Sequence, residues 1–421
     1  MKKFINISFL FAFVVLFVTT QYLFAGGFQI NEHGAKAMGM GGAFTGLASD
    51  PSAIFFNPAG LSFQKGANIM LGTTLIFPST TFTPKGSTQD AKMKSQIFYP
   101  SNIYGTYTMD DGLAFGIGVY NPYGLGTVWD KDWVGSRIAT KTELQTFFIN
   151  PSVSYKFNEQ LSFGIGVSYV LANVELSFRV PTFRTLLPPT PSTTDGTASL
   201  EADGNGINFN AGIIYRPFDN LMLGLAYRHS TKLELEGTAK FTDMNALQSF
   251  FPGGDGSTEI TLPLNLTFGA AIDVTKELTV STDIQFIGWS SYDSLVVKIT
   301  EGPASPLGVL QKGSTSIKDW KNAFILRWGV EYRFENWSLR GGLVFDVTPQ
   351  PLHKTEPMLP DGNRGEAMLG IGYNITENIM IDAAYQFIKL EQRAVVYSDI
   401  NFLGTYKSDA HLFGINVGYK F

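Results

Sequence analysis

The sequence contains no cysteine, has only 16% charged residues, and lacks a long apolar run after its N-terminal segment. Without cysteine, disulfides, thiolate nucleophiles and cysteine metal sites are excluded together. Without long apolar runs, helices that cross a membrane are excluded, because each needs about 20 consecutive apolar residues. Beyond position 25 the chain has 29 basic and 36 acidic residues, a net charge of −7 (29 − 36). Nothing in this balance attracts nucleic acid.

The N-terminus has the layout of a signal peptide. Lys2 and Lys3 precede an apolar run from Phe4 to Val18, and small residues follow. The alternative is an N-terminal membrane helix, but this run is shorter than the roughly 18 residues that a spanning helix needs. We therefore expect residues 1–25 to be removed on export by cleavage after Ala25.

Alternating strands are the main signal in the rest of the chain, which holds 35 Phe and 17 Tyr. Between Phe413 and Phe421 every second residue is apolar, and the residues between them are small or polar. Such a strand crosses a bilayer in about 9 to 11 residues without a hydropathy peak. The segments 161–169, 260–274 and 324–334 alternate in the same way. In 260–274 the pattern predicts one apolar face that includes Ile260, Leu262, Leu266 and Phe268.

Short polar turns join these segments in pairs, and the connections between pairs are long. Six turns are visible, at 110–112, 158–160, 218–220, 275–277, 335–337 and 376–378. With a first strand near Ala67 to Phe77 and a last one at the C-terminus, they predict an all-β barrel of fourteen antiparallel transmembrane strands. Aromatic residues beside the turns predict a girdle at the membrane interface: Phe157, Tyr215, Phe218, Phe334, Trp337 and Tyr373. A soluble exported sandwich or propeller is the alternative.

Residues 26–64 follow no period, although they contain many turn-forming residues. They include MGMGGAFTG and DPSAIFFNPAGLSF, in which Asn57 can bond its own backbone and Pro58 presets a turn. We expect this stretch to plug the lumen of a barrel formed by residues 65–421. Glycines on the predicted inner face either receive the backbone of such a plug or relieve curvature: Gly116, Gly118, Gly164, Gly166, Gly224, Gly370, Gly372, Gly414 and Gly418.

The segment GGFQINEHGAKAMGMGGAFTGLASDPSAIFFNPAGLSF resembles the N-terminal hatch of the FadL/TodX family of outer-membrane transporters, and residues 121–157 are similar to a second family stretch. The resemblance implies a fourteen-stranded barrel with the N-terminus inserted as a hatch. It also implies uptake of long-chain fatty acids or of aromatic or aliphatic hydrocarbons across a Gram-negative outer membrane. We expect a monomer without cofactor or metal, whose other partners are membrane lipid, lipopolysaccharide and the barrel-assembly machinery.

The resemblance also assigns roles to particular residues. The apolar residues of 241–251 share one helical face, and with the preceding loop they would line an outer capture groove: Phe183, Leu186, Leu187, Phe241, Met244, Leu247, Phe250 and Phe251. The alternative is a helix that packs on neighbouring loops. A deeper site would be touched by Phe28, at the hatch-tip position. Asn57-Pro58-Ala59 would form the hinge end of the hatch. Release would be sideways, where four residues weaken strand pairing: Gly116, Gly118, Asn121 and Pro122.

The charged residues predicted to face the lumen do not decide between an acidic and a neutral ligand. Arg327, Arg333 and Arg340 could receive a carboxylate, whereas Glu331 and Asp346 on the same face could pair with them. Neutral hydrocarbons therefore stay possible ligands.

Three other functions compete with transport of hydrophobic compounds. A general diffusion porin would need a charged constriction and no apolar plug. An outer-membrane hydrolase would need a positioned Ser/His or Asp/His set, and neither His229-Ser230 nor His353 has a partner at a recognisable spacing. A purely structural or adhesive barrel would leave the hatch without a role.

Overall fold

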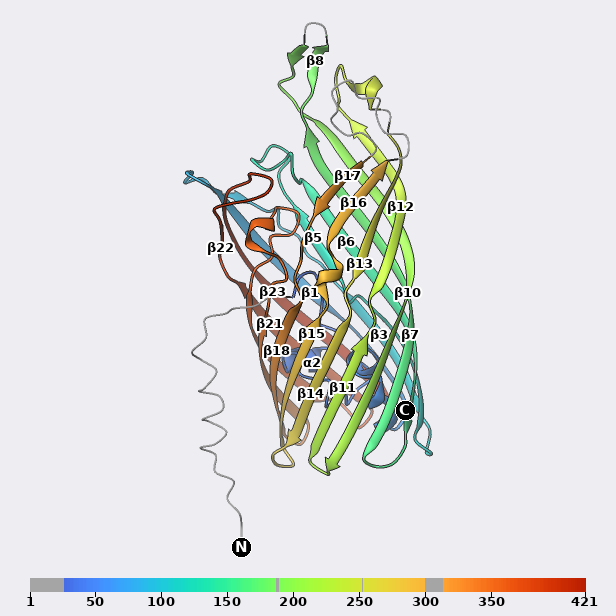
Figure 1. The fold of residues 1–421 in the computed structure, drawn as a ribbon. Coiled ribbons are helices and arrows are strands. Elements are labelled where there is room, and N and C mark those ends of the chain that lie inside the picture. The colour runs from blue at the N-terminus through green and yellow to red at the C-terminus, as the bar shows by residue number, and fades with distance from the viewer. Residues whose placement is uncertain (1–25, 187–188, 252, 300–312) are drawn as a thin grey trace.

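A closed antiparallel barrel with a folded segment inside it makes up the computed structural model, which describes residues 26–186, 189–251, 253–299 and 313–421 (Figure 1). The signal peptide expected at residues 1–25 lies outside the described residues. Among the described residues no helix is long and apolar enough to cross a membrane.

The described wall has fourteen positions, several of them built from two strands in succession. In chain order they are β1 (Gly66–Pro84), β3 (Ser101–Thr108), β4 (Leu113–Tyr120), β6 (Lys141–Lys156), β7 (Leu161–Val180), β10 (Gly196–Phe218), β11 (Leu221–Arg228) with β12 (Thr231–Thr242), β13 (Gly254–Leu262) with β14 (Asn265–Asp273), β15 (Leu278–Ile287) with β16 (Ser294–Ile299), β17 (Gly313–Ile317) with β18 (Ala323–Arg333), β19 (Trp337–Asp346), β20 (Arg364–Asn374), β21 (Ile379–Leu390) and β23 (Gly404–Lys420). The barrel closes where β1 pairs with β23, from Asn68 opposite Lys420 to Pro84 opposite Gly404.

Short elements complete the fold. The remaining strands are β2 (Ala91–Lys92), β5 (Gly124–Val128), β8 (Phe183–Leu186), β9 (Pro189–Pro191) and β22 (Arg393–Val395). The helical turns are α2 (Ala35–Gly39), α3 (Ala53–Phe56), η1 (Pro58–Phe63), η2 (Gln248–Phe250), η3 (Trp289–Ser291) and η4 (Leu352–Lys354).

The six predicted short turns all join neighbouring strands at one end of the barrel, here called the lower end (Figure 1). The predicted aromatic girdle lies there with its side chains exposed on the outer wall. Long connections and extended strands occupy the upper end, where β8 lies highest, above β7 and β10 (Figure 1). The fourteen-strand prediction is confirmed.

The polarity of the wall reverses along β7. In its lower half the outer face is apolar, with Phe163 and Ile165 exposed, while Ser162 and Ser168 face the lumen. In its upper half Glu175 faces outward, and the buried inner residues are Val170, Ala172, Val174 and Leu176. The residues of the lower half therefore suit lipid on the outside of the barrel. Those of the upper half suit water on the outside and an apolar interior.

The prediction of one continuous strand over 260–274 is wrong. Ile260 and Leu262 face inward, with 5% and 1% exposure, whereas Leu266 and Phe268 face outward, with 43% and 51% exposure. The chain breaks at Pro263, which cannot donate a ladder hydrogen bond, and the side-chain phase changes there. Above the break, the apolar side chains face the lumen. Below the break, they face the outside of the barrel.

Residues 26–64, the hatch, fill the lower lumen (Figure 1). Six of the predicted glycines face it: Gly116, Gly118, Gly164, Gly224, Gly370 and Gly414. The closest approaches are to backbone atoms, because a Cβ on Gly224 would lie 2.2 Å from Thr45 O and one on Gly164 would lie 2.4 Å from Ala59 N. The other three, Gly166, Gly372 and Gly418, meet wall atoms instead. Strand glycine in this wall therefore mostly makes room for the hatch.

Candidate functional site

The upper lumen is an apolar chamber built from the inner faces of β7, β10, β12 and β13. Its buried residues include Ala198, Leu200, Ala202, Leu233, Leu235, Ile260 and Leu262, together with the upper inner residues of β7. All belong to one continuous cluster that reaches down to Phe28 at the tip of the hatch. Each buried apolar side chain contributes about 1.5–3 kcal/mol relative to exposure, so the chamber is also a favourable environment for an apolar guest.

The two loops predicted to form a capture groove meet above this chamber. Phe183 and Asn245 form a parallel bridge, and Ala246 N donates to Phe183 O at 3.1 Å. Phe241 and Phe251 pack with ring centroids 5.2 Å apart. Of the predicted groove residues Phe241, Met244, Leu247 and Phe251 are buried, and Phe183 and Phe250 are partly exposed.

The predicted helical face over 241–251 is wrong. The strand β12 continues to Thr242, and η2 supplies one short 3-10 turn. Asp243 and Asn245 adopt positive φ, which a continuing α-helix does not allow. Inward packing of the apolar side chains replaces the helix. Leu186 ends β8, and Leu187 lies outside the described residues.

An aromatic cage holds the hatch tip at the floor of the chamber. The Phe28 ring lies 4.6 Å from Trp289, 5.6 Å from Tyr292 and 5.8 Å from Trp320 between ring centroids. Tyr123 completes the cage at 6.2 Å. Only Phe28 was expected from the sequence, because the cage residues come from three separate upper segments whose meeting no local pattern predicts.

A mostly apolar cavity adjoins the cage. It is lined by Phe28, Leu125, Leu144, Val174, Leu176, Ile260, Tyr292, Leu295, Trp320, Met358 and Leu359 among others. It contains one buried ion pair, between Lys318 and Glu356, whose side chains are 5% and 12% exposed. The sequence offered no signal for this pair, because the two residues lie in loops 38 positions apart. The cation of the apolar cavity is thus already neutralised.

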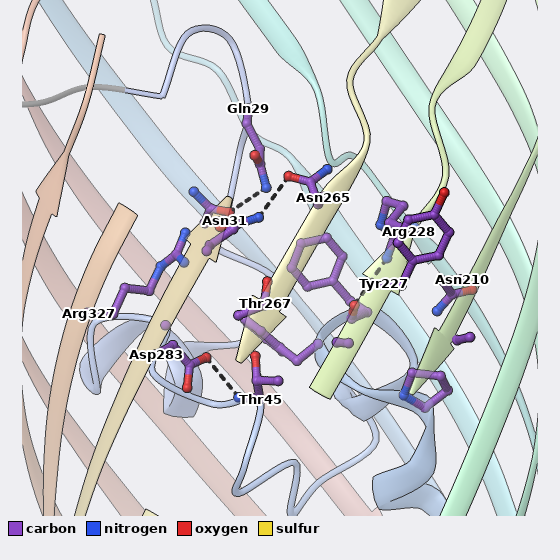
Figure 2. Close-up of a pocket in the computed structure, with 17 residues that line it drawn as sticks. Gln29, Asn31, Thr45, Asn210, Tyr227, Arg228, Asn265, Thr267, Asp283 and Arg327 are labelled. Carbon is purple, nitrogen blue, oxygen red and sulfur yellow. Dashed lines mark hydrogen bonds between the residues drawn. The ribbon is translucent and has the colours of Figure 1, made fainter. Parts of the chain in front are cut away.

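A second cavity lies between the hatch and the wall strands β10, β11, β14, β15 and β18 (Figure 2). Its lining mixes polar and apolar residues. The polar ones include Gln29, Asn31, Thr45, Asn210, Arg228, Asn265, Thr267, Asp283, Gln285 and Arg327, and the apolar ones include Phe55, Phe56 and Pro58. Phe28 lines the first cavity and its neighbour Gln29 lines the second. Consecutive residues of the hatch tip therefore line the two cavities.

Most of the predicted lumen charges pair with each other, as one of the two interpretations of the sequence had it. Arg340 bonds Glu331 at 2.8 Å and Asp382 at 2.5 Å. Arg333 bonds Glu331 at 2.9 Å. Asp346 is buried, and its Oδ1 has no hydrogen-bond partner among the described residues. Arg327 forms no ion pair within 4.0 Å among the described residues and instead lines the second cavity.

Asn57 fixes the hatch to itself and to the wall. Its Nδ2 donates to Thr45 O at 2.9 Å within the hatch and to Ile213 O of β10 at 3.1 Å. Its Oδ1 accepts from Ala59 N at 3.2 Å, which caps η1 with Pro58 in the first turn. Ala59 O in turn accepts the hydroxyls of Ser154 and Ser162. The Asn57-Pro58-Ala59 turn is thus the most firmly bonded contact between hatch and wall.

The wall is interrupted beside β5. Gly116 and Gly118 do not weaken pairing as predicted, because β4 keeps its ladder with both β3 and β6 and a Cβ at either glycine would meet Ile54. The interruption begins at Asn121 and Pro122. Ile30 N donates to Pro122 O and Gly124 N to Phe28 O, so this stretch pairs with the hatch tip.

One aromatic side chain covers the interruption. Among the described residues the only ladder of β5 is with β6. On its other side Phe98 lies against Gly126, where a Cβ would come within 2.1 Å of the Phe98 ring. Phe98 itself is bonded to Ile76 of β1 through two backbone hydrogen bonds. The boundary between β1 and β5 is therefore closed by the Phe98 side chain and by one backbone hydrogen bond, from Lys94 N to Val128 O at 2.7 Å, in place of a continuous ladder.

Neither His229 nor His353 has a Ser, Asp or Glu hydrogen-bond partner among the described residues. His229 accepts or donates a 2.8 Å hydrogen bond with Tyr227 and stacks on Phe209 at 4.4 Å, while His353 lies in η4. The described residues contain no group of three or more His, Cys, Asp or Glu side chains that could hold a metal ion.

Comparison with known proteins agrees with this architecture. Residues 15–421 match the outer membrane protein transport protein family (OMPP1/FadL/TodX). The long-chain fatty acid transport protein of Salmonella typhi is 24% identical, over 97% of each chain. A Pseudomonas aeruginosa FadL homologue has a TM-score of 0.80 at 21% identity, covering 94% of this chain and 99% of its own. The Ralstonia pickettii toluene transporter TbuX has a TM-score of 0.70 at 19% identity, covering 92% and 98%. The chain therefore belongs to the OMPP1/FadL/TodX family of outer membrane transport proteins, and its barrel lies in the Gram-negative outer membrane.

Proposed function

We propose that the protein takes up hydrophobic small molecules, either long-chain fatty acids or hydrocarbons, across the outer membrane. The observation that carries the proposal is the apolar chamber above the membrane, which ends on an aromatic cage at the hatch tip. The names of the relatives, which include a fatty acid transport protein and a toluene transporter, support both ligand classes. We further propose an exported monomer without enzymatic activity, whose residues 1–25 are its signal peptide.

Capture begins at the upper loops. Phe183 and Phe250 are the partly exposed members of the loop cluster, and the buried Phe241 and Phe251 lie directly behind them. A ligand that displaces these contacts enters a surface already lined by Val, Leu and Ala side chains. Because an apolar guest gains about 0.8 kcal/mol for each buried methylene, a long chain is drawn further in than a short one.

Movement of the hatch then opens the floor. The Phe28 ring occupies the cage itself, so a ligand that enters the cage competes with the hatch tip for the same aromatic faces. Withdrawal of Phe28 also breaks the two backbone bonds that join the hatch tip to Pro122 and Gly124. Movement of the hatch tip therefore also removes the hydrogen bonds that hold the segment leading into β5.

Release is lateral, into the bilayer. The covered interruption beside β5 is the exit, with Phe98 as the side chain that must move from Gly126. Ile97 and Tyr99, next to Phe98, are 56% and 71% exposed on the outside. A lateral route keeps the ligand in an apolar environment throughout, whereas a route into the periplasm would return it to water.

Identification of the bound ligand tests this function. The protein is purified from membranes, its lipids are extracted and analysed by mass spectrometry, and uptake of oleate and of toluene is measured in cells with and without it. We expect copurified apolar compounds and faster uptake of at least one of the two. Wild-type uptake equal to that of cells without the protein, for both compounds, would contradict the proposal.

A further inference from the structure

A pocket beside β17, at the upper end of the barrel (Figure 1), lies outside the proposed capture route. It is lined by residues 315–318 at and just after the end of β17, by 353–356 in and after η4, and by 398–400. None of these residues belongs to the loop cluster of Phe183 and Phe250. Its volume is about 330 Å³, which is within the range of small-molecule sites, about 300–1,000 Å³. The pocket is therefore large enough for a ligand, and the proposed function leaves it without a role.

The rim of this pocket is apolar and exposed. Ile317 and Ile400 line the pocket, and Leu352, Val396 and Tyr397 lie within two positions along the chain of other residues that do. These five residues are between 42% and 70% exposed. On β7, by contrast, the apolar side chains of the upper wall face the lumen. A group of exposed apolar side chains around one pocket marks a surface that contacts another molecule.

The lysines and carboxylates of the pocket are paired with one another. Lys354 bonds Asp399 at 2.5 Å, and Lys318 bonds Glu356. The imidazole of His353 lies 6.3 Å from the ring of Tyr397 between ring centroids. Because each lysine lies opposite a carboxylate, the pocket does not select its ligand by charge, and the apolar rim decides what it holds.

One ion pair lies between this pocket and the apolar cavity beside the cage. Lys318 and Glu356 line both spaces, and they are the two residues that the described linings share. Lys318 follows β17 and Glu356 lies in the loop after η4, so the pair joins two facing segments by their side chains. Side chains can change rotamer while the backbone ladders stay intact. A ligand that separates this pair can therefore pass inward without opening the wall.

We propose that the pocket is a second entry site for apolar ligands, which pass between Lys318 and Glu356 into the apolar cavity. The inference rests on the proposed function and adds to it a route that does not use the loop cluster of Phe183 and Phe250. The exposed rim gathers the ligand from water. The cavity then binds it more tightly, because Leu, Val and aromatic side chains surround it there and more of its apolar surface leaves water.

Photolabelling of the purified protein in amphipol tests the inference, with an analogue of lauryl alcohol that carries a diazirine at its tail. Adducts mapped by mass spectrometry should fall on the pocket and on the cage, and excess lauryl alcohol should remove both. Thr315→Trp fills the pocket from an exposed position, so pocket adducts should disappear. Cage adducts should then form about twofold more slowly after mixing, the value for two entries of similar flux. Ser314→Trp, at the exposed neighbour outside the lining, is the matched control and should label like the wild type.

The outcomes separate this inference from the proposed function. Cage adducts without pocket adducts, or equal rates of cage labelling in Thr315→Trp and Ser314→Trp, overturn the inference and leave uptake of hydrophobic compounds intact. Pocket adducts that excess lauryl alcohol does not remove overturn it as well, since the label would then mark any apolar surface. A wild type without displaceable adducts from the alcohol overturns the inference. If the matching diazirine fatty acid gives none either, the result contradicts both proposals.

Discussion

Single glycines decide where the hatch can sit against the wall. A Cβ on Gly342 of β19 would lie 2.2 Å from Gly41 N of the hatch, whereas one on Gly341 would meet nothing closer than Val330 Cγ1 at 3.5 Å. The sequence predicted that wall glycines make room for a plug or relieve curvature. It could not tell Gly370, which faces the hatch, from Gly372, which faces Arg340 and Asp382, because both share the inner phase of one strand.

Gly342→Val should displace the hatch, because overpacking a close backbone contact costs about 1–3 kcal/mol. The barrel ladder itself is unchanged, so the protein should still fold and run as a heat-modifiable band. In planar bilayers the variant should show higher ion conductance than the wild type. The adjacent Gly341→Val has the same added volume without the clash and serves as the control. Equal conductance of the two variants would show that the hatch is not held by this contact.

The hatch as an element is held at a few polar points, and Asn57 is the one with the most bonds. Asn57→Ala leaves Ala59 N without its side-chain acceptor, a loss of about 1–3 kcal/mol for a buried group. Uptake of a hydrophobic substrate should fall, because the hatch no longer has one defined seat from which to move. Asn205→Ala, at an exposed position of the same wall strand β10, is the control. Unchanged uptake with an assembled barrel would refute the gating role of the Asn57-Pro58-Ala59 turn.

The junction between β1 and β5 can be locked without touching the lumen. The chain has no native cysteine, so Phe98→Cys with Gly126→Cys gives one defined pair that dibromobimane can bridge. The bridge should stop uptake, because the ligand cannot pass between the two segments, while hatch-dependent ligand binding persists. Each single variant treated with the same reagent controls for modification alone. Full uptake after complete bridging would place the exit elsewhere.

At the scale of the whole molecule, the wall was predictable and the upper interior was not. Period-two alternation and six short turns gave fourteen strands, because the lipid-facing half of the barrel has one simple rule for its two faces. Above the membrane the apolar side chains face the lumen and no longer the outside. The side-chain phase changes at Pro263 as well, so the apolar residues of 260–274 alternate without a visible break in the sequence. The cage of Phe28, Trp289 and Trp320 could not be predicted either, since it depends on where long loops return.

The ladder between β1 and β23 fixes the order in which the molecule can be built. Its two strands are almost the whole described chain apart, so this seam is the contact with the largest loop to close, and it forms late. The hatch ends two residues before β1 begins, at Gln64 and Gly66, so it is tethered to one lip of the seam. Until the seam closes, the hatch can swing in from the side between the two unpaired edges. After closure, the hatch could enter only through an open end of the barrel, and the lumen is just wide enough for its side chains. Barrel closure therefore also fixes the hatch inside the lumen.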